Sequence, residues 1–308
     1  MERTLADTIR EITREHLENG NGLLLGQTIS AIGWVNNTVP PNCPGIVELP
    51  MVDVAGSGIA VGAAIVGRRP IFVIRYQDFL FLNSSPLVNY AAKSKDVFGV
   101  GVPIFIRAIA DEGKGLGPVH SACLHSIFMH MPGMRVSAPM TPKEYEEVWE
   151  VFLANDEPIF VSEHRRSFMQ KTEMPDTIID NADLTIFAIS AARFNTLETV
   201  EMLKQDGIRC NIVHIMWLKP FTLSPRLLEP LQDSGRGLVV DSDFEIGGAS
   251  QTIAYELMTA TSLPVRALGA YDRSVGAAPH LENGTPTPPR IAQVAREMVA
   301  ETEKGVRT

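Results

Sequence analysis

Two hydrophobic patterns alternate along the chain. The first is helical: near the N-terminus apolar residues recur on one face and are followed by Gly20, which can end a helix. These apolar residues are Leu5, Ile9, Ile12 and Leu17. The second consists of short runs that are apolar throughout, typical of strands buried on both faces of a parallel sheet. In the first half of the chain these runs are 22–26, 69–76, 102–108, 135–138 and 158–164.

Helices are expected between these strands. The segment 53–67 consists of small residues, and we predict a helix because Pro50 precedes it, Asp53 suits a cap or first turn, and Gly67 can end it. Its glycines would let another backbone approach closely. The other helices expected here lie at about 85–95, near 121 and at 141–156. Strands alternating with helices predict an α/β fold with a parallel sheet covered on both faces.

The same alternation restarts in the second half of the chain. A polar stretch at 164–183, which contains Pro175, predicts a linker, and we place the domain boundary between 1–175 and 176–308. Beside the linker, Arg165 and Arg166 favour a solvated or interdomain role over substrate binding. The strands expected in the second domain are 184–190, 210–216, 237–242 and 264–270, and the helices are 195–205, 224–231, 249–257 and 289–303.

Composition narrows the class of protein. The formal net charge of -9 argues against nonspecific binding to nucleic acid or to an anionic membrane. No apolar run approaches the ~20 residues that cross a bilayer, and the N-terminal segment lacks the apolar core of a signal peptide. The three cysteines lie far apart and form no C-x-x-C pair. We therefore expect a protein of the reducing cytoplasm.

Common catalytic motifs are mostly absent. The sequence contains no P-loop, G-x-S-x-G elbow, H-E-x-x-H or paired-cysteine zinc motif, and Gly56, Gly58 and Gly62 miss the G-x-G-x-x-G spacing. Histidines at 120, 125 and 130 recur every five residues. On a helix such neighbours point about 140° apart, so they form no common metal-binding face. No metal site is predicted.

Four residues have both a structural and a functional interpretation. His120 ends a glycine-rich loop where a helix is expected to begin, so an active-site role and a structural role remain equally open. Asp53 is either a helix cap or a catalytic carboxylate. Tyr76 and Phe79 end an apolar strand, where their rings either stack on a planar ligand or belong to the core.

Taken in order, several segments resemble the beta subunit of thiamine-diphosphate-dependent 2-oxo-acid dehydrogenases, which include pyruvate, branched-chain 2-oxo-acid and acetoin dehydrogenases. The resemblance covers nearly the whole chain. Its most specific parts are GPVHS, followed by HMPGMRVSAP, and the stretch EHRRSF. The other segments are LPMVDVAGSGIAVGAAIVGRRPIFVIRYQDFLF, NYAAK, VPIFIRA, NDEPIFVSEH, WLKPF and VDSDFEIGGASQTIA.

The resemblance implies a fold and an assembly. Two parallel-sheet α/β domains are expected, a thiamine-diphosphate-binding domain of the pyrimidine type and then a transketolase C-terminal-like domain. In the family, an α2β2 heterotetramer forms each active site between subunits, and the alpha subunit binds the diphosphate and Mg²⁺ through a G-D-G motif. No G-D-G occurs here, so this chain is expected to be inactive alone. Beta–beta self-association is also expected, and a lipoyl acyltransferase is a candidate partner.

The resemblance also implies roles for five residues. The family's P-x-x-E glutamate, whose carboxylate promotes the reactive tautomer of the aminopyrimidine, corresponds to Asp53, which is one methylene shorter. Phe79 matches the ring that stacks on the pyrimidine, and Tyr76 is expected beside it. His120 matches the histidine of G-P-x-H-S, which faces the substrate. Gln27 stands where the family often has a glutamate near the cofactor.

The function expected from the resemblance is that of a beta-type subunit that takes part in decarboxylating a 2-oxo acid and transferring the resulting acyl or aldehyde unit. Two alternatives stay open. Because two acidic positions are altered, the chain could instead belong to a split transketolase or to a specialised carboligase. It could also be a non-catalytic partner subunit in which Asp53 is only a cap.

Overall fold

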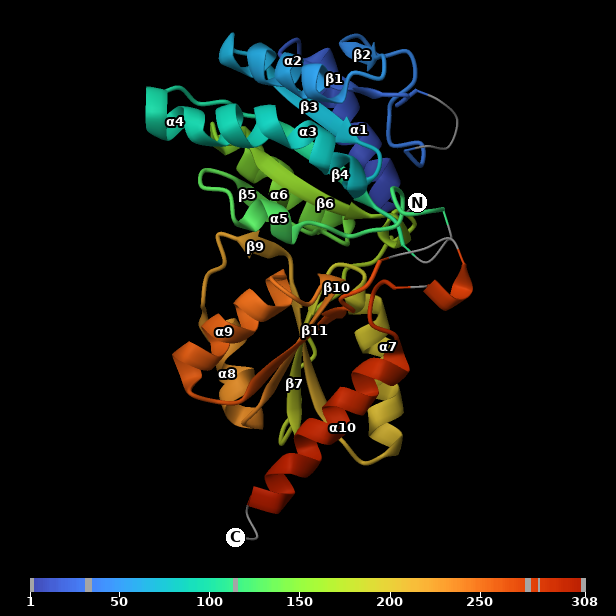
Figure 1. The fold of residues 1–308 in the computed structure, drawn as a ribbon, viewed down its shortest axis with the longest axis vertical. Helices are drawn as coiled ribbons and strands as arrows, with labels where there is room; N and C mark the ends of the chain where they lie inside the picture. Colours follow the sequence, from blue (N-terminus) through green and yellow to red (C-terminus); the bar gives the residue numbers. More distant parts are fainter. Residues whose placement is uncertain (1–2, 31–34, 113–115, 275–277, 282, 306–308) are drawn as a thin grey trace. The chain divides into compact units, whose positions relative to one another are not determined.

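The computed structural model describes residues 3–30, 35–112, 116–274, 278–281 and 283–305, and divides the chain into two compact units. The described residues of unit 1 come from 1–173, 216–220 and 275–282, and those of unit 2 from 174–215, 221–274 and 283–308. Each unit contains its own sheet (Figure 1). None of the described helices combines the length and the apolar character needed to span a bilayer.

The described part of unit 1 contains a seven-stranded sheet in the order β2-β1-β3-β4-β6-β5-β9. Neighbouring strands pair in parallel except for β9, which is antiparallel to β5. Strand bounds are β1 Gly22–Gln27, β2 Ile46–Leu49, β3 Arg69–Ile74, β4 Phe105–Ala110, β5 Arg135–Ser137, β6 Ile159–His164 and β9 Trp217–Lys219. The five predicted strands are confirmed, although β4 begins three residues later than expected.

The helices of unit 1 follow the predicted alternation, with two differences. The helix expected at 85–95 belongs to a longer helical run, in which a π-helical turn at Leu87–Ala92 joins α3 to α4. The helix expected near 121 begins only at Ser126. Helix bounds are α1 Leu5–Glu18, α2 Asp53–Ile65, α3 Leu80–Pro86, α4 Lys93–Phe98, α5 Ser126–Met129 and α6 Pro142–Ala154.

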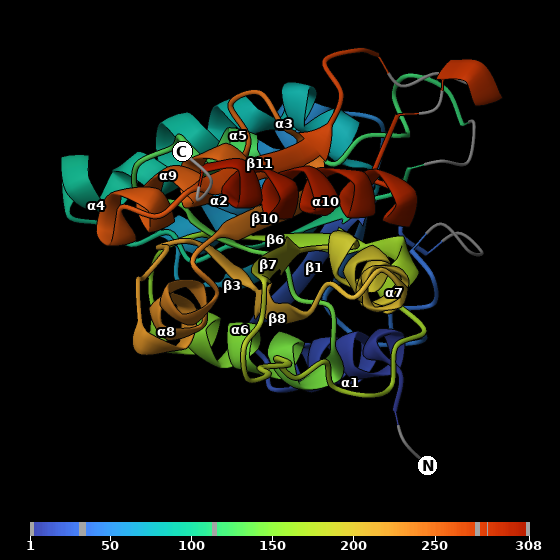
Figure 2. The same cartoon turned by 90° about the horizontal axis from the view of Figure 1, so that it is seen from below.

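The described part of unit 2 contains a four-stranded parallel sheet in the order β11-β10-β7-β8. The strands are β7 Leu184–Ile189, β8 Cys210–Ile215, β10 Gly237–Phe244 and β11 Val265–Ala270. The helices are α7 Ala192–Gln205, α8 Pro225–Ser234, α9 Ala249–Thr261 and α10 Pro288–Gly305. Helices α7 and α10 pack together on one face of the sheet, and α8 and α9 lie on the other (Figures 1 and 2). The parallel α/β pattern predicted for both halves is confirmed.

A buried ion pair joins the two central strands of unit 1. Arg107 on β4 donates from Nε and Nη2 to the two carboxylate oxygens of Glu163 on β6, at 2.7 and 2.9 Å. The Tyr145 hydroxyl donates to Glu163 at 2.7 Å, and Arg107 also donates to Thr38 at 2.8 Å. Burial, and then the negative charge of Glu163, hold the pKa of Tyr145 well above its ordinary value. Tyr145 therefore stays a hydrogen-bond donor.

The first prediction concerns the contribution of this ion pair to stability. Glu163→Gln keeps the shape of the side chain but leaves the Arg107 charge buried without its counter-charge, so the free energy of unfolding should fall by about 3 kcal/mol. Glu157→Gln is the control, because Glu157 pairs with Arg135 at 2.8 Å where both side chains are 27% exposed. That change should cost less than about 1 kcal/mol. Equal losses in urea unfolding would contradict the prediction.

The second prediction concerns His214 on β8 and the dependence of stability on pH. Its side chain is buried, and burial, followed by the charges of Arg193 and Arg226, lowers its pKa from 6.5 to about 3. Between these values the unfolded chain binds a proton that the folded chain excludes. The part of the free energy of unfolding that depends on His214 is therefore complete above pH ~6.5. It is lost as the pH falls, by about 2 kcal/mol at pH 5.

The measurement is urea unfolding of the wild type and of His214→Gln between pH 5 and pH 8. The variant has no imidazole to protonate, so its free energy of unfolding should depend less steeply on pH. Identical slopes for the two proteins would show that His214 titrates equally in the folded and unfolded states.

Candidate active site

The predicted site residues of unit 1 gather at one edge of its sheet. Strands β1, β3, β4 and β6 run parallel, so their carboxyl ends meet at the same edge. Gln27 is the last residue of β1, and Tyr76 lies two residues beyond β3. In parallel α/β sheets, ligands bind outside the carboxyl ends of the strands. This edge is therefore the place to look for chemistry.

Asp53 is held by a neighbouring helix. It is the first residue of α2, and Val52 occupies the N-cap position, so Asp53 lies in the first turn and not at the cap. Its Oδ1 accepts a hydrogen bond of 3.1 Å from Nδ2 of Asn83 on α3. The same Nδ2 donates to the backbone oxygen of Phe79 at 3.0 Å. Asn83 thereby fixes the Asp53 carboxylate beside the segment that carries Phe79.

An open hollow lies beside these groups. It is lined by Gln27, Asp53, Phe79, Asn83 and residues 72–75. Asn83 is 3% exposed, and its amide oxygen has no hydrogen-bond partner among the described residues. The hollow is therefore lined by a carboxylate and an aromatic ring, together with the residue Asn83, whose buried amide oxygen is unsatisfied. The structure thus brings together three predicted residues, Gln27, Asp53 and Phe79.

The other two predicted residues form an aromatic group on Phe79. The His120 ring contacts Tyr76 and Phe79 edge-to-face, with centroids 4.5 and 5.4 Å away. Tyr76 and Phe79 are 5.9 Å apart in the same geometry. Neither Tyr76 nor His120 lines the hollow, so Phe79 is the shared member of the two groups.

A half-buried aspartate, which no pattern in the sequence indicates, anchors the loop of His120. Oδ2 of Asp78 accepts the backbone N–H groups of Ser121 and Ala122 at 3.1 and 3.3 Å. Burial raises the pKa of the Asp78 carboxyl above its ordinary value, although these N–H donors act in the opposite direction. The sequence marks Asp78 only by its position between two candidate aromatic residues. Asn83 was also missed, since nothing in its local pattern points to Asp53.

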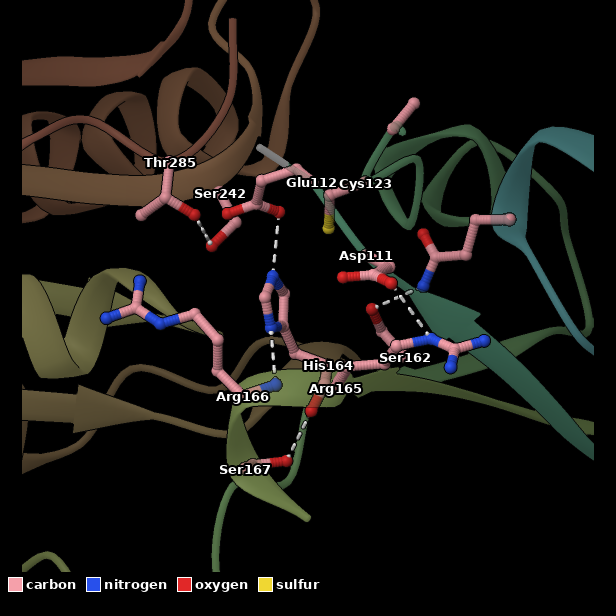
Figure 3. A network of polar contacts seen from close by, with 12 residues as sticks. Asp111, Glu112, Cys123, Ser162, His164, Arg165, Arg166, Ser167, Ser242 and Thr285 are labelled. Atoms are coloured by element: carbon pink, nitrogen blue, oxygen red, sulfur yellow. Dashed lines mark hydrogen bonds and ion pairs between the residues drawn. The ribbon is translucent and has the colours of Figure 1, made fainter. Parts of the chain in front are cut away.

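Charged groups pair at the ends of β4 and β6. Nε2 of His164 lies 2.7 Å from Glu112, and its Nδ1 accepts the backbone N–H of Arg166 at 3.2 Å (Figure 3). Because a backbone N–H can only donate, Nε2 carries the proton and donates to Glu112. Arg165 pairs with Asp111 at 3.1 Å. Its side chain is 10% exposed, so of the solvated or interdomain role that the sequence favours, the solvated one does not apply to Arg165.

The remaining histidines of the 120–130 segment do not join this site. His125 is buried, and its Nδ1 lies 3.3 Å from the Cys123 sulfur and 3.2 Å from the Ser162 hydroxyl. His130 is exposed. Within the described residues, no group of three or more acidic, histidine or cysteine side chains could hold a metal ion.

Comparison with known families now identifies the class of protein. Residues 46–171 match the family model "Transketolase, pyrimidine binding domain", and residues 176–291 match "Transketolase, C-terminal domain". The chain therefore belongs to the thiamine-diphosphate-dependent proteins that combine these two domains in this order. The fold and the family inferred from the sequence are both confirmed.

More particularly, the chain is a homologue of the beta subunits of 2-oxo-acid dehydrogenases. It is 28% identical to the acetoin:2,6-dichlorophenolindophenol oxidoreductase subunit beta of Cupriavidus necator over 64% of this chain and 62% of that protein. It is 24% identical to the pyruvate dehydrogenase E1 component subunit beta of Gracilaria tenuistipitata var. liui, over 82% and 83% of the two chains.

Solved structures share the fold. A split-gene transketolase, described as an inactive beta4 tetramer, superposes with a TM-score of 0.75 at 18% identity, over 97% of this chain and 99% of that one. Transketolase from Campylobacter jejuni gives a TM-score of 0.74 at 16% identity, over 96% of this chain and 46% of that one. The second coverage indicates that this chain corresponds to about half of a full-length transketolase.

The residues at the hollow fit the aminopyrimidine of thiamine diphosphate. A ring nitrogen of that group needs a carboxylate, which Asp53 offers, and its planar face needs an aromatic or apolar partner, which Phe79 offers. Its exocyclic amino group needs an acceptor, and the unpartnered amide oxygen of Asn83 is one.

Proposed function

We propose that this chain is the beta-type subunit of a heteromeric thiamine-diphosphate enzyme that decarboxylates a 2-oxo acid and transfers the resulting acyl or aldehyde unit. The observation that carries the proposal is the hollow at which Asp53 and Phe79 meet. Relatives named as beta subunits of pyruvate and 2-oxoisovalerate dehydrogenases support the substrate class. In this proposal residues 1–175 form the pyrimidine-binding domain and 176–308 the C-terminal domain.

Each side chain has a defined task. When bound, thiamine diphosphate supplies the carbon nucleophile and the electron sink. Asp53 shares a proton with the far ring nitrogen of the aminopyrimidine, and the N–H of Asn83 keeps the carboxylate in place. Phe79 contacts the ring face, with Tyr76 and Gln27 beside it. His120 exchanges a proton with the substrate, because an imidazole both donates and accepts near neutral pH.

An alpha subunit completes the site. Three observations support this part of the proposal. The sequence has no G-D-G motif for the diphosphate and Mg²⁺. The relatives are named as subunits. Large apolar side chains stand exposed on α2, α3 and α4, among them Val54, Phe81 and Phe98, and exposed apolar patches mark interaction surfaces. We propose an α2β2 assembly that includes a beta–beta contact, with a lipoyl acyltransferase as acceptor if the enzyme is a dehydrogenase.

Cofactor binding by the isolated chain is the third prediction. Without the diphosphate ligands, calorimetry should detect no micromolar, Mg²⁺-dependent binding of thiamine diphosphate. Adding the alpha subunit should restore it. Tight binding by the isolated chain would contradict the division of the cofactor between two subunits.

The fourth prediction concerns Asp53. In the assembled complex, Asp53→Asn keeps the size of the side chain but cannot share the proton, so deuterium exchange at the reactive thiazolium carbon should slow by ~10²–10⁴-fold. Asp53→Glu tests the missing methylene: faster exchange would show that the shorter acid limits the reaction, and slower exchange that the backbone is fitted to aspartate. Asp233→Asn, at an exposed carboxylate on α8, is the control.

The same experiment separates the alternatives. Unchanged exchange in Asp53→Asn would withdraw the catalytic assignment and favour a non-catalytic partner subunit. If exchange does slow, turnover with and without a lipoyl domain distinguishes a dehydrogenase from a carboligase or split transketolase. A dehydrogenase needs the lipoyl carrier as acceptor, whereas a carboligase or split transketolase transfers its unit to an aldehyde acceptor instead, the split transketolase from a ketose donor.

A further inference from the structure

A cation stacks on the aromatic group beside the hollow. The guanidinium carbon of Arg165 lies 4.9 Å from the centroid of the Tyr76 ring. Tyr76 is 4% exposed, so this contact is shielded from water, where cation–π attraction is stronger than at a surface. The Tyr76 ring in turn contacts the His120 ring at 4.5 Å with an interplanar angle of 79°. Arg165, Tyr76 and His120 therefore form a continuous chain of contacts, with the guanidinium over the Tyr76 ring and the His120 ring edge-to-face with it.

The guanidinium is itself held in place. Arg165 pairs with Asp111 at 3.1 Å and donates from Nη1 to the side-chain oxygen of Asn36 at 3.0 Å. The register of the sheet explains the first contact: Ala110 pairs with His164, so Asp111 and Arg165 are the next residues along two adjacent strands (Figure 3). A planar guanidinium fixed by two partners cannot rotate freely, and it limits the tilt of the ring beneath it.

Hydrogen bonds fix the backbone beside His120, but they do not fix the orientation of its ring. Asp78 holds the backbone at Ser121 and Ala122. These bonds set the position of the Cα atom but leave the side-chain torsions of His120 undetermined. The rings of Tyr76 and Phe79 supply the remaining restraint. Of these two rings, Tyr76 is the one under the fixed cation.

We propose that Arg165 is a positioning residue for His120, acting through Tyr76, with Asp111 holding the guanidinium in place. The catalytic part of this inference rests on the proposed role of His120 toward substrate. The structural part does not, because ring orientation can be measured without substrate or partner.

The structural test uses NMR of the full-length chain carrying ring-labelled histidine. The His120 signal is identified as the one absent from His120→Ala. In Arg165→Met, which keeps an apolar stem but removes the planar cation, this signal should move or broaden. Arg165→Lys keeps the charge without the planar fork and should restore it only in part. Arg166→Met removes the adjacent exposed cation and should leave the signal in place.

Two outcomes would overturn the positioning role. One is an unchanged His120 signal in folded Arg165→Met, and the other is an equal change in Arg166→Met. If Arg165→Met does not fold, Asp111→Asn takes its place, since it removes the partner charge at constant size. Asp111→Asn should move the His120 signal in the same direction, and an unmoved signal would contradict the proposal.

Kinetics of the assembled complex test the consequence, with pyruvate and 2-oxoisovalerate as assayed substrates. Arg165→Met should lower kcat about 10- to 100-fold, as expected for a misplaced catalytic group, while KM changes less than about 2-fold. Combined with His120→Ala, it should have no further effect; additive losses would contradict the proposal. Wild-type turnover in His120→Ala would instead refute the role given to His120, and the NMR result would still decide the positioning.

Discussion

The buried pair of Arg107 and Glu163 is the interaction on which the edge of unit 1 depends. Arg107 is 0% and Glu163 1% exposed, so neither charge is tolerable without the other. The pair fixes β4 against β6 just before both strands end, and Tyr145 adds helix α6 to the same network. The residues that follow on the two strands therefore emerge in a fixed register.

Polar groups continue from that pair to the site. One step beyond the strands, Asp111 meets Arg165 and Glu112 meets His164. Asp111 has the Arg165 guanidinium as its counter-charge, and Glu112 accepts a hydrogen bond from His164. These partners permit so many polar groups in a poorly hydrated place. Arg165 then contacts Tyr76, and Tyr76 contacts His120. A structural ion pair and a candidate proton-transfer group are thus ends of one chain of contacts.

The sequence predicts the sheets well and the site only in part. Strands such as 22–26 are recognisable because they are apolar throughout, whereas β2 was missed because it is short and half exposed. Asp53, Phe79 and His120 were found through family motifs. Asn83, Asp78 and Arg165 were not, because their partners lie 30, 43 or 44, and 54 residues away in the chain. Only the folded chain brings such pairs together.

The glycines of α2 differ in how closely they are packed. A Cβ on Gly56 would come within 3.0 Å of the Leu49 side chain, so a larger residue would have to displace that side chain where α2 packs on its own sheet. A Cβ on Gly58 or Gly62 would meet nothing within 4 Å among the described residues. Packing within the described chain therefore does not explain these two glycines. Glycine weakens a helix by about 1 kcal/mol relative to alanine, so Gly58 and Gly62 lower the helix propensity of α2 without a packing contact among the described residues that offsets it.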